Sequence, residues 1–479
     1  MSYQEHVVKY LDDHAGEITA IAKSLWENPE LGLKEFHASK LLADGLKKAG
    51  FSVKMGVADM PTAFVAEWGE GKPVIGILAE YDALPGLSQK ISAVKDPIKA
   101  GAPGHGCGHN LFGAGSFGTV IAVKDYMEKN TVKGTLRLYG TPAEELGIGK
   151  PYMARAGLFD DLDAAITWHP MSLNMTMGNT NPGETSLLAL NSFKVQFTGR
   201  AAHAAGNPQQ GRSALKAIQL LDTGVQYMRE HIPPQARIHS VITDGGGAPN
   251  VVPAFAEAWY FIRAPKRDMV NSIYAWIEDI IKGAALMTQT TYEIEFLSGL
   301  YELLGNKVLS LNLLENMKKV GDLKFSDEDK AFAKEMIESV PPQMLQAVKQ
   351  SFLTGVQPGT TAEEIGEYLN EKPLTPVWGL TGDMSGSTDV GDVSFITPTG
   401  QITAASVPLG IPLHSWQSTA CTGSDIGFKS AVYAAKVMAL TSLDLFTKPD
   451  LLQAAKDEFM QATGGKKYVS PLPEGAKPH

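Results

Sequence analysis

The feature of this sequence that most constrains its fold is a series of short apolar runs that alternate with helical patterns. The runs lie at residues 63–68, 74–78, 136–139 and 164–168, and glycine, proline or charged residues flank each of them. A clear helical pattern occupies residues 113–127. Continuous apolar runs separated by helices are typical of parallel strands that are buried on both faces. The sequence therefore predicts an α/β fold with a mostly parallel sheet covered on both faces.

The pattern of apolar residues along the chain changes after about residue 191. Four segments alternate as strands, and two amphipathic helices separate them: the strands read SFKVQFTG, ARIHSVIT, AEAWYFIRA and TYEIEFL, and the helices span 211–231 and 268–286. The resulting order, βαββαβ, is that of a ferredoxin-like sandwich, a compact unit that can be inserted into another domain. The outer edge strand of this unit is an expected place for subunits to pair.

These two patterns divide the chain into three parts. Residues 1–190 are predicted to form the first part of a catalytic domain, and 191–300 an inserted lid or dimerisation domain. Residues 301–479 return to the catalytic domain. The charged stretch at about 323–378 is interpreted as a helical insertion within this last part.

Charge and cysteine content restrict the partners and the compartment. The 479 residues carry a formal net charge of -10, which disfavours nucleic acid or an anionic membrane as the main partner. No basic, apolar leader and no apolar run of membrane-spanning length is visible. With only two cysteines, Cys107 and Cys421, a disulfide framework is not expected and a reducing cytoplasm is the predicted location.

Polar side chains follow three of the predicted strands. Glu80 and Asp82 follow VIGILA, the pair Glu144 and Glu145 follows TLRLYG, and His169 ends AAITWH. Ligands of open α/β sheets bind beyond the carboxyl ends of the strands. We therefore expect these carboxylates and this imidazole to meet at one rim of the sheet.

The segment GHGCGHN adds Cys107 and His109 to this set. On an extended backbone these two alternate residues would point to one side, and the glycines allow an unusual turn close to a bound ion. A thiolate, imidazoles and carboxylates together suit Zn²⁺, Mn²⁺ or Co²⁺ better than Ca²⁺ or Mg²⁺. Each motif alone has an ordinary structural explanation, but their combination on one rim indicates a metal site.

The sequence resembles the M20 metallopeptidases, and within them the amidohydrolase branch that carries a Cys-x-His metal motif. The resemblance spans nearly the whole chain and rests on WENPELGLKE, AEYDALPG, GHGCGHN, PAEE, TWHP, FTGRAAHAA, GRSAL, APNVV, FIRAP, STDVGDVS and HSW. It departs from the branch at Asn110 and Trp416, where aspartate and proline are common, and at Ala143, where one group within the branch has glycine. None of these departures removes an implied ligand, but they leave the substrate open.

The resemblance implies a two-metal active site. Two divalent ions per subunit, manganese or zinc, would be held by five side chains: Cys107, His109, Glu145, His169 and His414. Glu144 would be the general base. Asp82 would orient one of the metal ligands without binding an ion itself. His203 would donate to the developing oxyanion in the partner subunit's site, and Asn250 and Arg263 would anchor a substrate carboxylate.

The implied reaction is hydrolysis of the amide bond of an N-acyl or N-aroyl amino acid. The first candidate substrate is p-aminobenzoyl-glutamate, which would give p-aminobenzoate and glutamate. Two alternatives stay open: a dipeptidase or aminopeptidase of the same fold, and a non-catalytic partner subunit of a heteromeric hydrolase. The implied assembly is a homodimer or a heterodimer with a homologous subunit.

Overall fold

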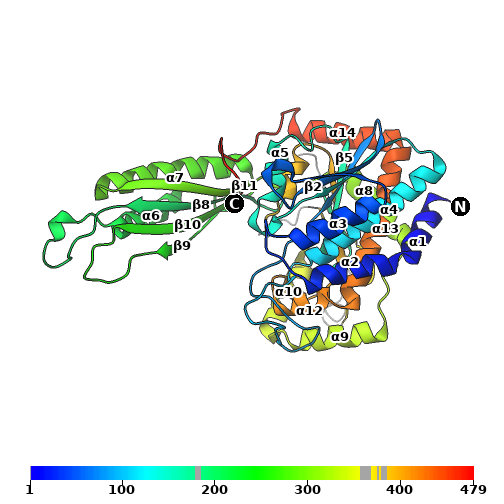
Figure 1. Ribbon diagram of the computed structural model, residues 1–479, viewed down its shortest axis with the longest axis horizontal. Helices are drawn as coiled ribbons and strands as arrows, with labels where there is room; N and C mark the ends of the chain where they lie inside the picture. The colour runs from blue at the N-terminus through cyan, green and yellow to red at the C-terminus, as the bar shows by residue number, and fades with distance from the viewer. Residues whose placement is uncertain (1, 179–184, 356–367, 375–376, 379–385, 479) are drawn as a thin grey trace.

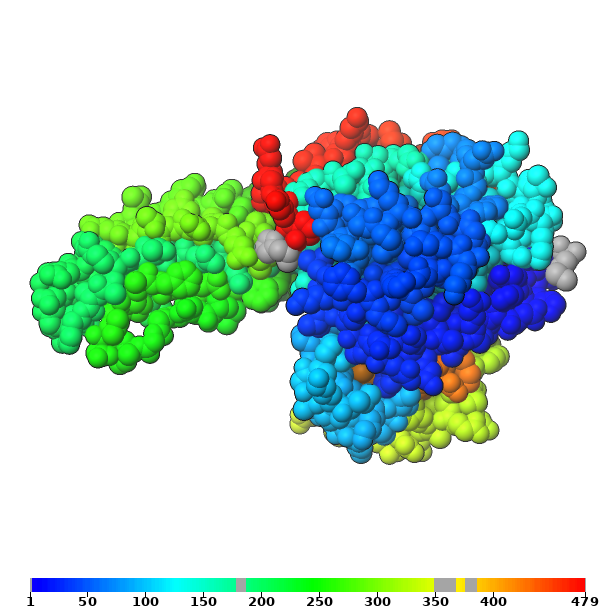
Figure 2. Space-filling model, viewed as in Figure 1, coloured from blue at the N-terminus to red at the C-terminus, as the bar shows by residue number. Residues whose placement is uncertain are grey.

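The computed structural model of the protein describes residues 2–178, 185–355, 368–374, 377–378 and 386–478. It shows a large α/β domain from which a smaller domain projects as an arm (Figure 1). The same arm stands clear of the large domain in the space-filling view, where its residues are green (Figure 2).

Within the described residues, an eight-stranded sheet forms the centre of the large domain. Its order is β1-β2-β4-β3-β5-β14-β6-β13. The four central strands β4, β3, β5 and β14 run parallel, whereas β2 and β6 lie antiparallel to their neighbours β4 and β14. The strands are β1 (Ser52–Met55), β2 (Phe64–Glu70), β3 (Val74–Ala79), β4 (Gly134–Gly140), β5 (Ala164–Met171), β6 (Met175–Gly178), β13 (Val377–Trp378) and β14 (Thr399–Ala405). The predicted mostly parallel sheet is confirmed.

Helices cover both faces of this sheet. Ile75 and Ile77 of β3 belong to the core beneath α4 and α13, while Leu78 of the same strand belongs to the core beneath α5 and α11. Successive residues of a strand point to opposite faces, so a strand covered on both sides is apolar throughout. The helices of the large domain are α1 (Tyr3–Asp13), α2 (Ala15–Glu27), α3 (Phe36–Lys48), α4 (His109–Asn130), α5 (Gly149–Arg155), α8 (Lys307–Val320), α11 (Val390–Ser394), α12 (Trp416–Thr422), α13 (Asp425–Thr447) and α14 (Pro449–Thr463).

The arm is the predicted ferredoxin-like unit. Its sheet has the order β11-β8-β10-β9 with antiparallel neighbours, and β9 is an edge strand. Helices α6 and α7 contact each other and the sheet, so they cover the same face. The elements are β8 (Ala189–Thr198), α6 (Ala214–Met228), β9 (Arg237–Asp244), β10 (Phe255–Ala264), α7 (Arg267–Thr288) and β11 (Thr291–Leu300).

The predicted helical insertion, at about 323–378, contains two described helices. Helices α9 (Asp327–Glu338) and α10 (Pro342–Gly355) lie in it. Part of the interval falls outside the described residues, namely 356–367 and 375–376. No helix in the described part of the chain is long and apolar enough to cross a membrane.

A buried arginine joins the arm to the large domain. Arg267, at the start of α7, donates to the carbonyl oxygens of Leu190 and Leu300, which belong to the two strands that enter and leave the arm. Its backbone N–H binds the carboxylate of Glu302 at 2.8 Å. At the base of the arm, β7 (Thr185–Ser186) pairs with β12 (Leu303–Leu304), so the two connections run side by side.

This geometry predicts that the arm can be excised. Replacing residues 188–301 by a short glycine-serine linker should leave the large domain folded, because β7 and β12 already bring the two ends together. The arm has its own hydrophobic core, so most of its buried apolar side chains pack within the arm itself. Circular dichroism melts should retain one cooperative transition. A shortened chain that elutes as an aggregate and melts without cooperativity would contradict the division at about 190 and 300.

Candidate metal centre and active site

Four parallel strands deliver the predicted site residues to one edge of the sheet. Glu80 and Asp82 directly follow β3, and His169 lies near the carboxyl end of β5. The loop after β4 carries Glu144 and Glu145, and the loop after β14 carries His414. This edge is where an open α/β sheet binds its ligands.

The GHGCGHN segment forms a turn, which its glycines allow, rather than an extended strand. Gly108 has a φ of 83°, and His109 is the first residue of α4. A side chain at position 108 would also come within 2.8 Å of Pro170. The turn brings Cys107 and His109 to the same site, where both belong to one group of candidate ligands.

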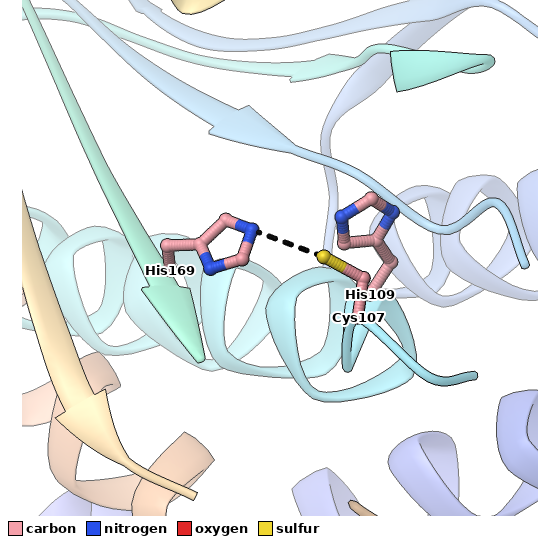
Figure 3. Close-up of side chains that lie close together, drawn as sticks. All are labelled: Cys107, His109 and His169. Carbon is pink, nitrogen blue, oxygen red and sulfur yellow. Dashed lines mark hydrogen bonds between the residues drawn. The ribbon is translucent and has the colours of Figure 1, made fainter. Parts of the chain in front are cut away.

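Five candidate ligands form two groups of three described side chains, and the two groups share one thiol. Cys107, His109 and His169 form the first group, and Cys107, Glu145 and His414 form the second. Cys107 and His169 point towards each other in Figure 3. The Sγ of Cys107 lies 3.6 Å from Nε2 of His169, and Nε2 of His414 lies 3.5 Å from Oε1 of Glu145. Atoms bound at about 2.0–2.3 Å to one tetrahedral ion lie roughly 3.3–3.6 Å apart. The spacing therefore fits one ion in each group.

Hydrogen bonds fix the tautomers of two of these histidines. Nδ1 of His109 binds a carboxylate oxygen of Asp82 at 2.8 Å, and Nδ1 of His169 donates to the carbonyl oxygen of Pro170 at 2.8 Å. In each ring the proton stays on Nδ1, so the lone pair of Nε2 faces the site. A metal-binding imidazole usually donates its other ring N–H to a carboxylate or a carbonyl oxygen in this way.

Several buried atoms of this cluster have no hydrogen-bond partner. They include Oε2 of Glu80, Nε2 of His109 and Oε1 of Glu145. Burial raises the pKa of Glu145 to about 7, and burial with the neighbouring charge of Glu80 raises the pKa of Glu144 above its ordinary value. Bound cations would supply both the missing partners and the opposite charge. The residues present therefore fit a pair of divalent ions.

The loop that carries Glu144 and Glu145 is held in an unusual conformation. Ala143 has a φ of 56°, a region that favours glycine, and its N–H donates to Oε1 of Glu35 at 2.8 Å. The second oxygen of Glu35 accepts from the hydroxyl of Thr62 at 2.9 Å. Glu35 was not predicted to contribute to the site, although it closes the WENPELGLKE motif. Its carboxylate supports the strained turn that places the glutamate pair.

A buried ion triad borders the site and was also missed. Lys150 is fully buried, and its Nζ binds Oε1 of Glu80 at 2.6 Å and a carboxylate oxygen of Asp389. The segment STDVGDVS, which contains Asp389, was recognised as a motif but received no role. The 239 positions that separate Lys150 from Asp389 explain why spacing in the sequence does not reveal the contact.

The residues predicted on the arm lie at two separate ends of it. Arg263 sits near the large domain, where it donates to the hydroxyl of Ser387 at 3.4 Å. His203 and Asn250 lie beyond the opposite end of β8 and β10, in loops joined by the His203–Val251 bridge. The ten residues of β8 span about 30 Å. His203 and Asn250 therefore lie far from the candidate ligands of their own chain.

Two further residues noted in the sequence have structural explanations. Asn110 donates from Nδ2 to the carbonyl oxygens of Ala22 and Thr422, so it joins the core behind the site. Cys421 is buried and unpaired in an apolar cluster, in agreement with a structural role.

Comparison with known proteins identifies the family of this fold and site. Residues 76–387 match the model of "Peptidase family M20/M25/M40". The chain is 39% identical to an Escherichia coli protein that is named as one of the subunits of p-aminobenzoyl-glutamate hydrolase, with 99% of each chain covered. The chain therefore belongs to peptidase family M20 and is a metallohydrolase that acts on amide bonds.

More distant relatives share the architecture. The human protein named Xaa-Arg dipeptidase is 28% identical over 96% of this chain and 92% of its own length. A Bacillus subtilis structure described as a dinuclear metal-binding peptidase from the M20 family superimposes with a TM-score of 0.54 at 17% identity. That superposition covers 89% of this chain and 98% of the other. The α/β domain with a separate four-stranded antiparallel sheet is therefore the fold of M20 peptidases.

The shared thiol makes metal stoichiometry a direct test of the site. Cys107→Ala should abolish tight binding of both ions, because Cys107 belongs to both donor groups. His414→Ala should weaken only one ion, because His414 belongs to the second group alone. Equilibrium dialysis with Zn²⁺ or Mn²⁺, followed by elemental analysis, counts the ions. Equal losses in the two variants would contradict a bridging role of the thiol.

Proposed function

We propose that this protein is a two-metal amidohydrolase that cleaves an N-acyl or N-aroyl amino acid beside its free carboxylate, with p-aminobenzoyl-glutamate as the first substrate. The observation that carries the proposal is the pair of donor groups sharing Cys107, with Glu144 beside them. The substrate choice rests on the Escherichia coli relative that is named for p-aminobenzoyl-glutamate hydrolysis.

Five side chains would hold the ions. Cys107 would be shared, His109 and His169 would complete one site, and Glu145 and His414 the other. Two divalent ions, manganese or zinc, would polarise the scissile carbonyl and lower the pKa of a bound water. The side chain of His414 is 52% exposed, so it would lie at the mouth through which substrate enters.

Glu144 is proposed as the general base. Its Oε2 lies 4.0 Å from Nε2 of His109, and its side chain is only 11% exposed. It directly precedes the candidate ligand Glu145, whose N–H is held at 2.9 Å by Asp82. From this position Glu144 would take a proton from the attacking water and return it to the leaving amine.

His203 is proposed as a donor to the oxyanion in the partner subunit's site. Its Nδ1 accepts from the backbone N–H groups of Ala205 and Gly206 at 3.2 and 3.0 Å. The proton of the neutral ring therefore sits on Nε2, where it can be donated. Because His203 is exposed at the far end of the arm, the centre that it serves belongs to a second subunit.

The arm would also bind the substrate carboxylate. Arg263 lies near the large domain of its own chain, and its planar guanidinium can pair with a carboxylate in a bidentate manner. Asn250 lies beside His203, since Asn250 accepts the N–H of Ala204 at 3.0 Å. Arg263 would therefore act in its own active site, and Asn250 in that of the partner.

A dimer through the arm supplies the second subunit in this proposal. The edge strand β9 is mostly exposed and presents Val241 and Ile242, which are 55% and 49% exposed. An open edge strand with apolar side chains is suited to pairing with a second strand. The partner would be a second copy or a homologous chain, since the relative in Escherichia coli is named as one subunit of its hydrolase.

A substrate panel separates this proposal from its alternatives. Amino-acid release should be measured from p-aminobenzoyl-glutamate, other N-acyl amino acids and dipeptides, with Mn²⁺ or Zn²⁺ added. Cleavage of acyl-blocked substrates would exclude an aminopeptidase, which needs a free amine. Preference for dipeptides would instead favour the activity in the name of the human relative, Xaa-Arg dipeptidase. A metal-loaded chain that acts only after a homologous subunit is added would be a partner subunit.

Removing the proposed base should stop hydrolysis without removing metal. Glu144→Gln is expected to lower kcat by about 100-fold or more, because an amide cannot accept the proton. The control is Glu70→Gln, at the exposed end of β2. Full activity of Glu144→Gln, at wild-type metal content, would refute the assigned role.

The proposed reach of His203 into the partner can be tested by mixing two inactive variants. His203→Ala and Glu144→Gln should each be inactive as a pure protein. After subunit exchange, a mixed dimer would contain one site with both an intact Glu144 and an intact His203. Partial recovery of activity on mixing is therefore expected. Without recovery, despite mixed dimers detected by differently tagged chains, His203 would act within its own chain or not at all.

A further inference from the structure

At the edge of the site, only one of the two oxygens of the Glu80 carboxylate has a hydrogen-bond partner. Glu80 is 1% exposed, and its Oε1 accepts from Nζ of Lys150 at 2.6 Å. Its Oε2 is buried and has no hydrogen-bond partner. A carboxylate that served only as the partner of a lysine would not require its second oxygen to stay buried and unpaired.

The unpartnered oxygen points into the candidate metal centre. Oε2 of Glu80 lies 3.3 Å from Nε2 of His109, the atom left free by the hydrogen bond to Asp82. Glu80, His109 and Glu144 form a third group of donor atoms within 4.8 Å of one another. The 3.3 Å spacing falls in the range of roughly 3.3–3.6 Å expected for two donors of one tetrahedral ion.

Lys150 fixes which oxygen of Glu80 faces the site. Its Nζ is held between Glu80 and Asp389, and its backbone N–H donates to Oδ2 of Asp389 at 3.0 Å. Lys150 is therefore tied to Asp389 through both main chain and side chain. With the ammonium held in place, Glu80 binds it through Oε1, and Oε2 is directed towards His109.

The surroundings explain why this position takes a lysine. Glu80, Glu144 and Asp389 all lie near the ammonium, and they raise the pKa of Lys150 despite its burial. Among the described residues, Lys150 is the only buried lysine. Its ammonium group therefore places a positive charge beside Glu80 in the interior.

We propose that Glu80 is an additional oxygen donor of the metal centre, and that Lys150, clamped by Asp389, is the residue that positions it. This inference rests on the metal centre proposed above and adds a sixth side chain to its five donors. Lys150 and Asp389 act through Glu80 and touch neither substrate nor ion.

The test measures metal affinity, so it does not depend on a known substrate. Chelator-treated wild type, Glu80→Gln, Lys150→Met and the double variant are titrated with Zn²⁺ in equilibrium dialysis. Titration with Co²⁺ in parallel reports the ligand field through the visible spectrum. Glu80→Gln should bind one of the two ions about 10–100-fold more weakly, as residues around a metal site typically do when altered. Its Co²⁺ spectrum should also change.

The double variant separates a positioning role from a merely structural one. If Lys150 acts through Glu80, Lys150→Met should weaken the same ion, and the double variant should bind it no more weakly than Glu80→Gln. Should Lys150→Met fail to fold, Asp389→Asn replaces it with the same expectation. The matched control is Asp392→Asn, a buried aspartate three residues further along whose carboxylate accepts from Tyr468 and Tyr301. It should leave metal affinity unchanged.

The outcomes distinguish the inference from the proposed function. Wild-type affinity for both ions in Glu80→Gln, with an unchanged Co²⁺ spectrum, would overturn the role of Glu80 while leaving the five-ligand centre intact. Additive losses in the double variant would overturn the positioning role of Lys150. A wild-type chain that binds no metal would overturn the metal centre itself and the inference with it.

Discussion

The carboxylate of Asp82 is the contact on which the rest of the site depends. One oxygen holds Nδ1 of His109 at 2.8 Å, and the other accepts the N–H of Glu145 at 2.9 Å. A single buried side chain at the end of β3 thus orients candidate donors from both metal groups, one at the start of α4 and one after β4. Fixed dipoles and ligands of this kind need no reorganisation when an ion or a developing charge arrives.

In the proposed mechanism the two domains divide the chemistry between the central sheet and the arm. The candidate ligands stand at the ends of strands buried on both faces, where the geometry is firmly set. The groups proposed to bind substrate stand on an arm whose attachment passes through the short pairing of β7 with β12 and through Arg267. His203 lies at the far end of that arm, so in the proposed mechanism the complete active site is a property of the assembly and not of one chain.

The sequence could predict the parts of this arrangement that local pattern controls. Glu80, Asp82 and His169 follow apolar runs, and parallel strands bring such residues to one edge, so their meeting could be inferred. The contacts of Lys150 with Asp389 and of Glu35 with Ala143 could not, because they join distant segments through tertiary packing. For Cys107 and His109 the sequence left two conformations open, an extended backbone and a turn at the glycines, because the local pattern allows both; the structure has the turn, with a left-handed Gly108 before α4.

The electrostatics of the site link metal binding to the stability of the fold. Glu80, Asp82, Glu144, Glu145 and Asp389 gather around one edge of the sheet, and Lys150 is the lysine buried among them. Carboxylates crowded in a poorly solvated space repel one another. This repulsion raises the free energy of the folded chain alone, because the unfolded chain disperses the carboxylates in water. Cations that bind the folded state relieve that repulsion and so stabilise it in proportion to their occupancy. The packing of the sheet and helices therefore maintains a cluster of charges that is unfavourable by itself, and in the proposed metal centre that cluster would be the source of the affinity for metal.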